Sequence, residues 1–520
     1  MLTPFRWVIA GRFSAAPSGE LFRANDGEWV ELLARKCGAI RARVTDRIGA
    51  ADYREVALDV KSMRAFSVSS VIESNPELKA LRAIADRPPA STVGALAELE
   101  RIAGRGRLWD ACSAAAGAAT AAHSTALDDV LEAARTQRTD AARAIDAFLA
   151  SSRNSGAATH GRSDPALERI RAAISECLAA TALDVLRSEP LATLEANWRG
   201  LRMLLERCRP QAGIRVDVLD VAGEGVAAAL RALPRSDEFD NPDALFVVDE
   251  VASLQLLGEL TKYAEETSTP CIATISPRVL EVKDTEELVR RAEQGGPIDS
   301  AWEEFRASEA SRWLCATLND VILHAEQSEP TQRVVAGSSA WAVAAMLAES
   351  WSSKGSFAHV LGRSGAISAP AVWTPPDRVR TTAIATENFV PIAAQKDLAR
   401  WGVLAVGSER DSDRVVLAAA PMASSAPGAY PLPAQLLAGR IVRFTQWVRE
   451  QLTPAMDDAT VRAVYEQAAS VFLFPGISPT TSMLKALVSN DRDARVIRIE
   501  ANVAPSHALV PLQIELSFRL

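Results

Sequence analysis

The stretch that decides the fold runs from Ser188 to Pro210 and reads SEPLATLEANWRGLRMLLERCRP. Ser188 is suited to cap a helix, Pro190 to occupy its first turn, and Pro210 to end it. Apolar residues recur at three- and four-residue steps and share one helical face: Leu191, Leu194, Trp198, Leu201 and Leu205. The stretch therefore predicts an amphipathic helix that buries one stripe.

The other side of this helix carries charges that we expect to face water. Glu195 stands four residues before Arg199, and Arg202 stands four residues before Glu206. Charges at this spacing are neighbours on a helix surface and pair there.

Composition narrows the class of protein. A chain of 520 residues is long enough for several domains, and 48% hydrophobic with 23% charged residues is ordinary for a chain with a sizeable core. The net charge of −8 argues against a general nucleic-acid binder, which needs a basic face.

Nothing in the sequence indicates a metal, a cofactor or a membrane segment. The six cysteines are scattered without a CxxC pair, and the five histidines supply no HExxH. The opening MLTPFRWVIAGRF has too short an apolar run for a signal peptide, and no run approaches the ~18 residues of a membrane helix. We therefore expect a cytoplasmic protein without membrane insertion, metal or cofactor.

The pattern along the chain predicts an α/β protein in four parts. Residues 1–90 read as a small α+β unit, and 91–163 as an Ala-rich helical connector that ends in a polar linker at 151–163. Residues 164–490 read as an α/β region with a mixed sheet, and 491–520 as antiparallel strands.

The α/β prediction depends mainly on residues 214–275. Strands are expected at Ile214–Leu219, Leu245–Val248 and Cys271–Ile275, with helices between them. This order is typical of a mostly parallel sheet covered on both faces. Beyond it, a helix is expected over Trp302–Leu314.

The same region also allows an enzyme hypothesis. Gly223-x-Gly225-x-x-Ala228 follows a strand and opens a helix, as a dinucleotide-binding turn does, although Glu224 stands where pyrophosphate would approach. Leu245–Glu250 resembles a nucleotide-hydrolysing strand, but the chain has no Gly-Lys pair for a phosphate loop. A tight turn and a polar strand end are the alternative interpretations.

Two C-terminal strands alternate apolar and polar residues. The apolar positions are Ile497, Ile499, Ala501 and Val503 in the first strand and Leu512, Ile514, Leu516 and Phe518 in the second. A strand at the chain end can add to the sheet edge of a neighbouring subunit, or pair within its own subunit; the sequence leaves both open.

Two motifs resemble the large contractile-sheath subunit of bacterial type VI secretion systems. One is Leu-Glu-x-x-Trp-Arg-Gly-Leu, formed by Leu194, Glu195, Trp198, Arg199, Gly200 and Leu201. The other resembles Trp-x-x-x-Arg-x-Ser-Glu-x-x-Arg and is formed by Trp302, Arg306, Glu309 and Arg312. The Arg443-Phe444 pair also matches this family.

The first 90 residues resemble the small sheath subunit of the same systems. They contain Gly11-Arg12-Phe13, Arg23 and Pro76-Glu77-Leu78, with Arg12 where the family often has an aspartate. The chain is thus similar to a natural fusion of both sheath subunits.

This resemblance implies a structural role without catalysis. Sheath subunits polymerise into a helical tube around an inner tube protein, attached in the bacterial cytoplasm to an envelope-docked baseplate, and the tube contracts to drive the inner tube outward. In the family an ATPase recycles contracted sheaths through a helix near the start of the large subunit, which the fusion places mid-chain, around 108–187. The alternatives are a nucleotide- or dinucleotide-dependent enzyme built on 214–275 and a non-polymerising baseplate or cap component.

Overall fold

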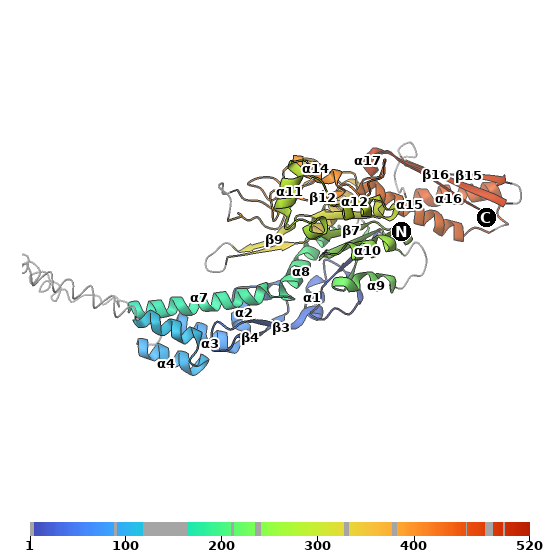
Figure 1. Cartoon of the computed structure of the whole chain (residues 1–520). Helices are drawn as coiled ribbons and strands as arrows, with labels where there is room; N and C mark the ends of the chain where they lie inside the picture. Colours follow the sequence, from blue (N-terminus) through green and yellow to red (C-terminus); the bar gives the residue numbers. More distant parts are fainter. Residues whose placement is uncertain are drawn as a thin grey trace, which may run out of the picture.

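A central body carries two projections on opposite sides (Figure 1). The computed structural model describes residues 5–87, 91–117, 164–209, 213–233, 241–326, 332–376, 382–453, 455–473, 482–491 and 494–519. One projection is a helical arm that includes α4 (Thr92–Ala103) and α7 (Pro165–Arg187), and the other holds the C-terminal strands. The expected linker at 151–163 and most of the expected connector lie outside the described residues.

The described part of the central body contains a seven-stranded sheet in the order β12-β8-β7-β6-β1-β5-β2. Its edge strand β2 runs antiparallel to β5, and the other pairings are parallel. The strands are β1 (Phe5–Gly11), β2 (Leu21–Ala24), β5 (Ile214–Asp220), β6 (Ala244–Val251), β7 (Cys271–Ile275), β8 (Leu314–Leu318) and β12 (Val403–Ala405).

Both faces of this sheet are buried, as the sequence predicts. Trp7 and Ile9 of β1 enter one hydrophobic core together with α8 (Leu191–Leu205) and α13 (Ser339–Lys354). Val8 and Ala10 enter a second core on the opposite face. The helices of that core are α9 (Val226–Arg231), α10 (Leu254–Glu266), α11 (Thr285–Glu293), α12 (Ser300–Ala307) and α14 (Ile392–Arg400). The mixed α/β fold class is therefore confirmed.

The N-terminal 90 residues are divided between the central sheet and a separate two-stranded sheet. β1 lies in the middle of the central sheet, with Phe5 opposite Ile214 and Trp7 opposite Ala244. β2 joins the edge of the same sheet. The other elements are the two-stranded sheet and three helices: α1 (Trp29–Cys37), β3 (Gly38–Thr45), β4 (Tyr53–Val60), α2 (Val68–Ser74) and α3 (Pro76–Asp86). Of these, β3, α2 and α3 pack on α7.

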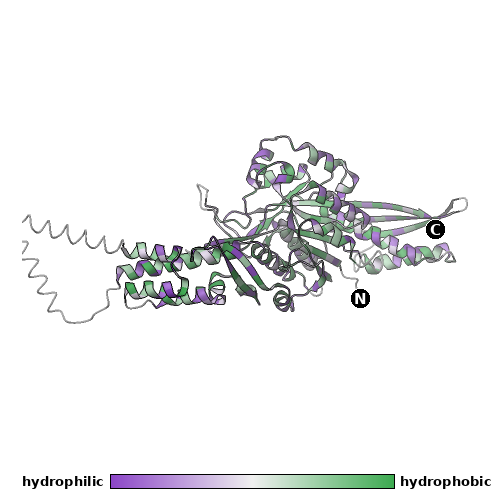
Figure 2. Ribbon diagram, turned by 60° about the horizontal axis from the view of Figure 1, so that its bottom comes forward, coloured by the Kyte–Doolittle hydropathy of each residue, from purple (hydrophilic) through white to green (hydrophobic). Residues whose placement is uncertain are grey.

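Short sheets and a C-terminal group of elements complete the described fold. β9 (Val321–Glu326) pairs with β10 (Arg333–Gly337), and a small sheet joins β11 (Ile367–Ser368), β14 (Arg414–Val416) and β13 (Gly407–Ser408). The C-terminal elements are α15 (Leu432–Glu450), α16 (Asp458–Phe472), β15 (Ser482–Asp491), β16 (Ala494–Val503), α17 (Pro505–Ala508) and β17 (Leu512–Arg519). Figure 2 shows hydrophobic and hydrophilic residues alternating along the C-terminal strands.

Three local predictions need correction. Helix α8 begins at Leu191 after Pro190 and ends at Leu205, well before Pro210; the Ser188 hydroxyl donates to the Val185 carbonyl at the end of α7 instead of capping α8. The helix predicted over Trp302–Leu314 ends at Ala307, because the apolar run from Leu314 pairs with β7 as strand β8. Strand β15 was not predicted.

Gly200 on α8 allows a close approach to α13, and its replacement gives a test of this packing. A Cβ at Gly200 would lie 2.5 Å from ring atoms of Trp341, which is itself fully buried. We expect Gly200→Ala to lower the free energy of unfolding by about 1–3 kcal/mol through overpacking. In the control Gly258→Ala on α10, the new Cβ meets no atom within 4 Å. That variant should be neutral or more stable by up to about 1 kcal/mol in urea denaturation; equal effects of the two changes would contradict this packing.

Candidate assembly interface

The C-terminal sheet places β16 between β15 and β17, all antiparallel. Ile499 lies opposite Leu516, and Ala501 opposite Ile514. The predicted alternation of β17 is confirmed, because Leu512 is buried, the next three apolar residues are half-buried, and the residues between them are exposed. The sheet thus has one apolar face and one polar face.

The apolar face of this sheet is covered by the subunit itself. Ile497, Ile499, Ala501, Val503 and Leu512 are buried in the same core as residues of α15 and α16. The Phe518 ring lies 6.1 Å from that of Tyr465 and 5.3 Å from the guanidinium of Arg449. A neighbouring subunit can therefore meet the edges and the polar face of the sheet, but not its apolar face.

Strand β17 has an outer edge that is open at its centre. The Gln513 carbonyl accepts from the Tyr430 hydroxyl (2.9 Å) and the Arg519 carbonyl from Arg449 (3.4 Å), both outside the sheet. Odd-numbered residues of β17 therefore direct their backbone groups away from β16. For Glu515 and Ser517, no described residue supplies a backbone hydrogen bond on that side.

A buried carboxylate fixes α15, the support of this sheet, to the central sheet. Asp243, just before β6, accepts from Arg443 (2.6 Å) and Arg440 (2.8 Å) of α15 and from the backbone N–H of Arg6 (2.8 Å). Arg443 is 1% exposed and also donates to the Ser268 carbonyl. The Arg440 guanidinium lies 4.1 Å from the centre of the Phe5 ring. Asp243 and its partners therefore link α15 to the start of β1 and β6.

Glu195 of the first motif is buried, so its predicted position in water is wrong. Its side chain is 1% exposed; it pairs with Arg199 at 2.7 Å, as predicted, and with both terminal nitrogens of Arg333 on β10. Arg333 also donates to the Phe66 carbonyl at 2.9 Å. The exposed pair Arg202–Glu206 forms as predicted, at 2.8 Å.

The other residues of this motif join the N-terminal segment to the α/β region. Leu194 and Leu201 lie in the core with Gly200 against Trp341, and the Trp198 indole donates to the Phe13 carbonyl at 3.1 Å. The neighbouring Asn197 donates to the Arg12 carbonyl (3.0 Å) and to Asp249 (2.9 Å). The residues of this motif therefore form a joint between the N-terminal segment and the α/β region.

The second motif is a joint as well. The Trp302 indole donates to the Trp401 carbonyl at 2.8 Å. Arg306 is buried and donates to the carbonyls of Ala423 and Arg400, both at 2.9 Å. Glu309 and Arg312 pair on the surface at 3.1 Å. Trp302 and Arg306 therefore anchor the α14–β12 segment. The exposed pair of Glu309 and Arg312 contributes little to the free energy of unfolding.

The structure argues against phosphate binding at the carboxyl edge of the central sheet. Gly223 adopts φ +58°, the tight turn of the alternative interpretation. The crevice beside it measures about 400 Å³, and Arg12 is its single basic side chain against four carboxylates: Glu189, Asp249, Glu250 and Asp320. This charge repels a pyrophosphate group.

Burial makes this crevice sensitive to pH. Burial, with Glu387 and Glu250 nearby, raises the pKa of Asp320 to about 7. Burial and the charge of Glu250 also raise the pKa of Glu387, and burial raises that of Asp249. Asp320 accepts from the backbone N–H of Ser339 at the start of α13 (3.1 Å), so its charge is coupled to that helix.

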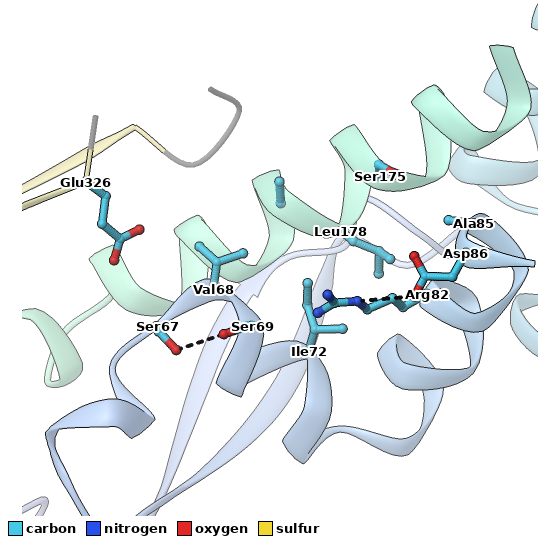
Figure 3. A pocket seen from close by; sticks show the side chains of 11 residues that line it. Ser67, Val68, Ser69, Ile72, Arg82, Ala85, Asp86, Ser175, Leu178 and Glu326 are labelled. Carbon is cyan, nitrogen blue, oxygen red and sulfur yellow. Dashed lines mark hydrogen bonds and ion pairs between the residues drawn. The ribbon is translucent and has the colours of Figure 1, made fainter. Parts of the chain in front are cut away.

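A separate pocket of about 420 Å³ lies between α2, α3 and α7 (Figure 3). Val68, Ile72 and Leu178 supply apolar lining, and Arg82 with Asp86 and Glu326 lie around it. Arg82 already pairs with Asp86 (3.6 Å), and Glu326 with Arg333 (3.0 Å). The pocket therefore offers no unpaired charge to a ligand.

Within the described ranges, no group of three histidine, cysteine or acidic side chains could hold a metal ion, and no helix is long and apolar enough to cross a membrane. Burial raises the pKa of the Cys37, Cys112, Cys208 and Cys271 thiols to about 12, which leaves them unreactive.

Comparison with known proteins gives structural neighbours only. No protein-family model matches the chain, and no curated protein matches its sequence. Similar solved structures include the contracted sheath complex of an extracellular contractile injection system, PVC (9% identity, TM-score 0.37, covering 59% of this chain and 76% of that one). Two others belong to the anti-feeding prophage. Its baseplate shares 11% identity (TM-score 0.36, 59% and 75% covered), and its contracted helical sheath 13% (TM-score 0.36, 63% and 82% covered).

Several residues that build these joints were missed by the sequence analysis. Arg333 and Asp243 have no local pattern, because their partners lie 138 residues and about 200 residues away in the chain. Asn197 stands inside the first motif. Its polar side chain beside the apolar positions of the helix could have indicated a buried hydrogen bond.

The buried Glu195–Arg333 pair gives a second prediction. Glu195→Gln removes the buried carboxylate that faces both terminal nitrogens of Arg333 and leaves Glu326 as the acidic partner of that guanidinium. We expect this loss to cost about 2–4 kcal/mol of unfolding free energy. Glu206→Gln removes the matched exposed pair with Arg202 and should cost less than about 1 kcal/mol. Chemical denaturation measures both costs, and a cost for Glu195→Gln as small as that of the control would contradict the structural role of the Glu195–Arg333 pair.

The pKa of Asp320 gives a third prediction. Because this pKa is raised on folding, the folded chain holds a proton that the unfolded chain releases, and stability falls as pH rises from about 4 through 7. Asp320→Asn cannot ionise, so it should be more stable than the wild type at pH 8, by a margin that shrinks toward pH 5. Melting temperatures across this range test it; a constant difference would show that Asp320 does not titrate there.

Proposed function

We propose that this chain is a structural subunit of a contractile injection sheath of the type VI secretion class. It polymerises into a helical tube around an inner tube protein, is attached to a baseplate in the bacterial cytoplasm, and contracts to drive the inner tube outward. No catalysis is part of this role, because the work comes from rearranged contacts between subunits.

The observation that carries the proposal is the open outer edge of β17. The strand is held on one side by β16, its apolar side chains are used within the subunit, and the backbone groups at Glu515 and Ser517 point outward. A strand from a second copy can hydrogen-bond there and extend the sheet. Repeated at every copy, such pairing links subunits while leaving their bodies free to rotate.

The two motif joints support the same role. Glu195, Trp198 and Asn197 tie a segment that resembles the small sheath subunit to one that resembles the large subunit. β1 also connects the two segments, because this N-terminal strand lies between β5 and β6 of the second segment. We infer that the fusion moves as one body, with Asp243 and its partners Arg440 and Arg443 passing force to the C-terminal sheet.

Recycling by an ATPase is not favoured by the position of α7. In the proposed fusion, α7 falls within 108–187, the region that would contain the helix bound by the ATPase. Its Ile170, Ile174 and Leu178 are buried, and it packs on α2 and α3. An ATPase would have to pull it out of the core.

Two other functions compete with this one. The dinucleotide enzyme is disfavoured by the acidic crevice beside Gly223. A baseplate or cap component that never polymerises would have the same fold, so assembly of the purified chain separates it from a sheath subunit.

A fourth prediction tests the edge of β17. Ser517→Pro removes one outward N–H and keeps the residues that face β16, so we expect a folded subunit whose yield of tubules falls at least about tenfold. Ser517→Ala keeps the N–H and should assemble like the wild type. Pelleting and negative-stain electron microscopy measure the yield, and circular dichroism checks folding.

A deletion of residues 512–520 should give the same loss of tubules in a chain that stays soluble. Normal tubules from both the deletion and Ser517→Pro would contradict the edge-pairing role. A wild-type chain that stays monomeric at all concentrations would favour the baseplate or cap alternative.

A further inference from the structure

A large cavity lies beside α14. It measures about 810 Å³ and is called the basic pocket here; its lining includes Arg363, Phe389, Pro391, Ile392, Lys396 and Arg410. Ile392 is 59% exposed, so apolar surface continues from the cavity to the rim. A cavity of this size accommodates one or two large apolar side chains.

The rim of the basic pocket carries more positive than negative charge. Arg363 pairs with Glu409 at 3.1 Å. The Arg410 guanidinium lies 4.6 Å from the centre of the Phe389 ring, and neither Arg410 nor Lys396 has an acidic partner among the described residues. The chemistry of the pocket therefore fits an apolar side chain flanked by carboxylates.

The chain itself presents such a segment at the start of α1. Val30 is 43% exposed, and the exposed Glu28 and Glu31 beside it form no ion pair with any described residue. Of the other exposed large apolar side chains in the described ranges, only Tyr53 has carboxylates within three residues, and both of those are paired, with Arg107 and Arg41. Val30 with Glu28 and Glu31 is called the acidic ridge.

We propose that the acidic ridge of one copy docks into the basic pocket of the next. The buried residues of α1 and α14 belong to different cores, and Figure 1 shows the two helices well apart, so one copy cannot close this contact on itself. A contact between two different surfaces of identical subunits generates rings or open helical polymers. The inference deepens the proposed function, on which it rests, by naming a second contact independent of β17.

Charge exchange between the two surfaces tests this contact. Lys396→Glu/Arg410→Glu makes the pocket acidic, and Glu28→Lys/Glu31→Lys makes the ridge basic. Each double variant should lower tubule yield at least about tenfold, and the quadruple variant should recover to within about threefold of the wild type. Arg169→Glu/Lys262→Glu is the matched control, because it reverses two exposed cations outside both surfaces and should leave the yield unchanged.

A second measurement separates failure of this contact from failure of the proposed function. In sedimentation velocity, the Ser517→Pro chain should still self-associate with rising concentration, and Glu28→Lys/Glu31→Lys in that background should remove the association. If both double charge variants form tubules as well as the wild type does, the proposed contact is wrong and the sheath proposal stands. A quadruple variant no better than the doubles would also overturn the contact, whereas a wild-type chain that never polymerises would overturn the sheath proposal instead.

Discussion

The carboxylate of Asp243 joins the C-terminal elements to the central sheet. It lies at the start of β6, is buried, and is neutralised by two guanidinium groups of α15 and one backbone N–H of β1. A buried charge that loses its partners costs several kcal/mol, so α15 has one well-defined position. The C-terminal sheet packs on α15 and α16, so the position of α15 constrains the sheet.

A buried ion pair also fixes the connection between α8 and the N-terminal segment. Glu195 on α8 holds Arg333, which in turn reaches the Phe66 carbonyl of the N-terminal segment. The core packing of α8 against α13 is non-directional, whereas these charged hydrogen bonds fix an angle. The molecule therefore combines two buried ionic connections with a β17 edge that is open at its centre.

The sequence was informative where the pattern is local. Continuous apolar runs marked β6 and β7, the stripe of Leu191, Leu194 and Trp198 marked α8, and strict alternation marked β17. It was misleading where the partner is distant. Glu195 has the spacing of a surface ion pair with Arg199, and only Arg333, 138 residues away, draws it into the core. The place of β1 between β5 and β6 likewise depends on a pairing across more than 200 residues, which no local period can encode.

Cryo-electron microscopy of the purified full-length chain tests the central claim most directly. The account predicts helical tubules in which a strand of a neighbouring copy lies against the outer edge of β17 at Glu515 and Ser517. Single particles at every concentration, or tubules in which that edge faces solvent, would contradict it.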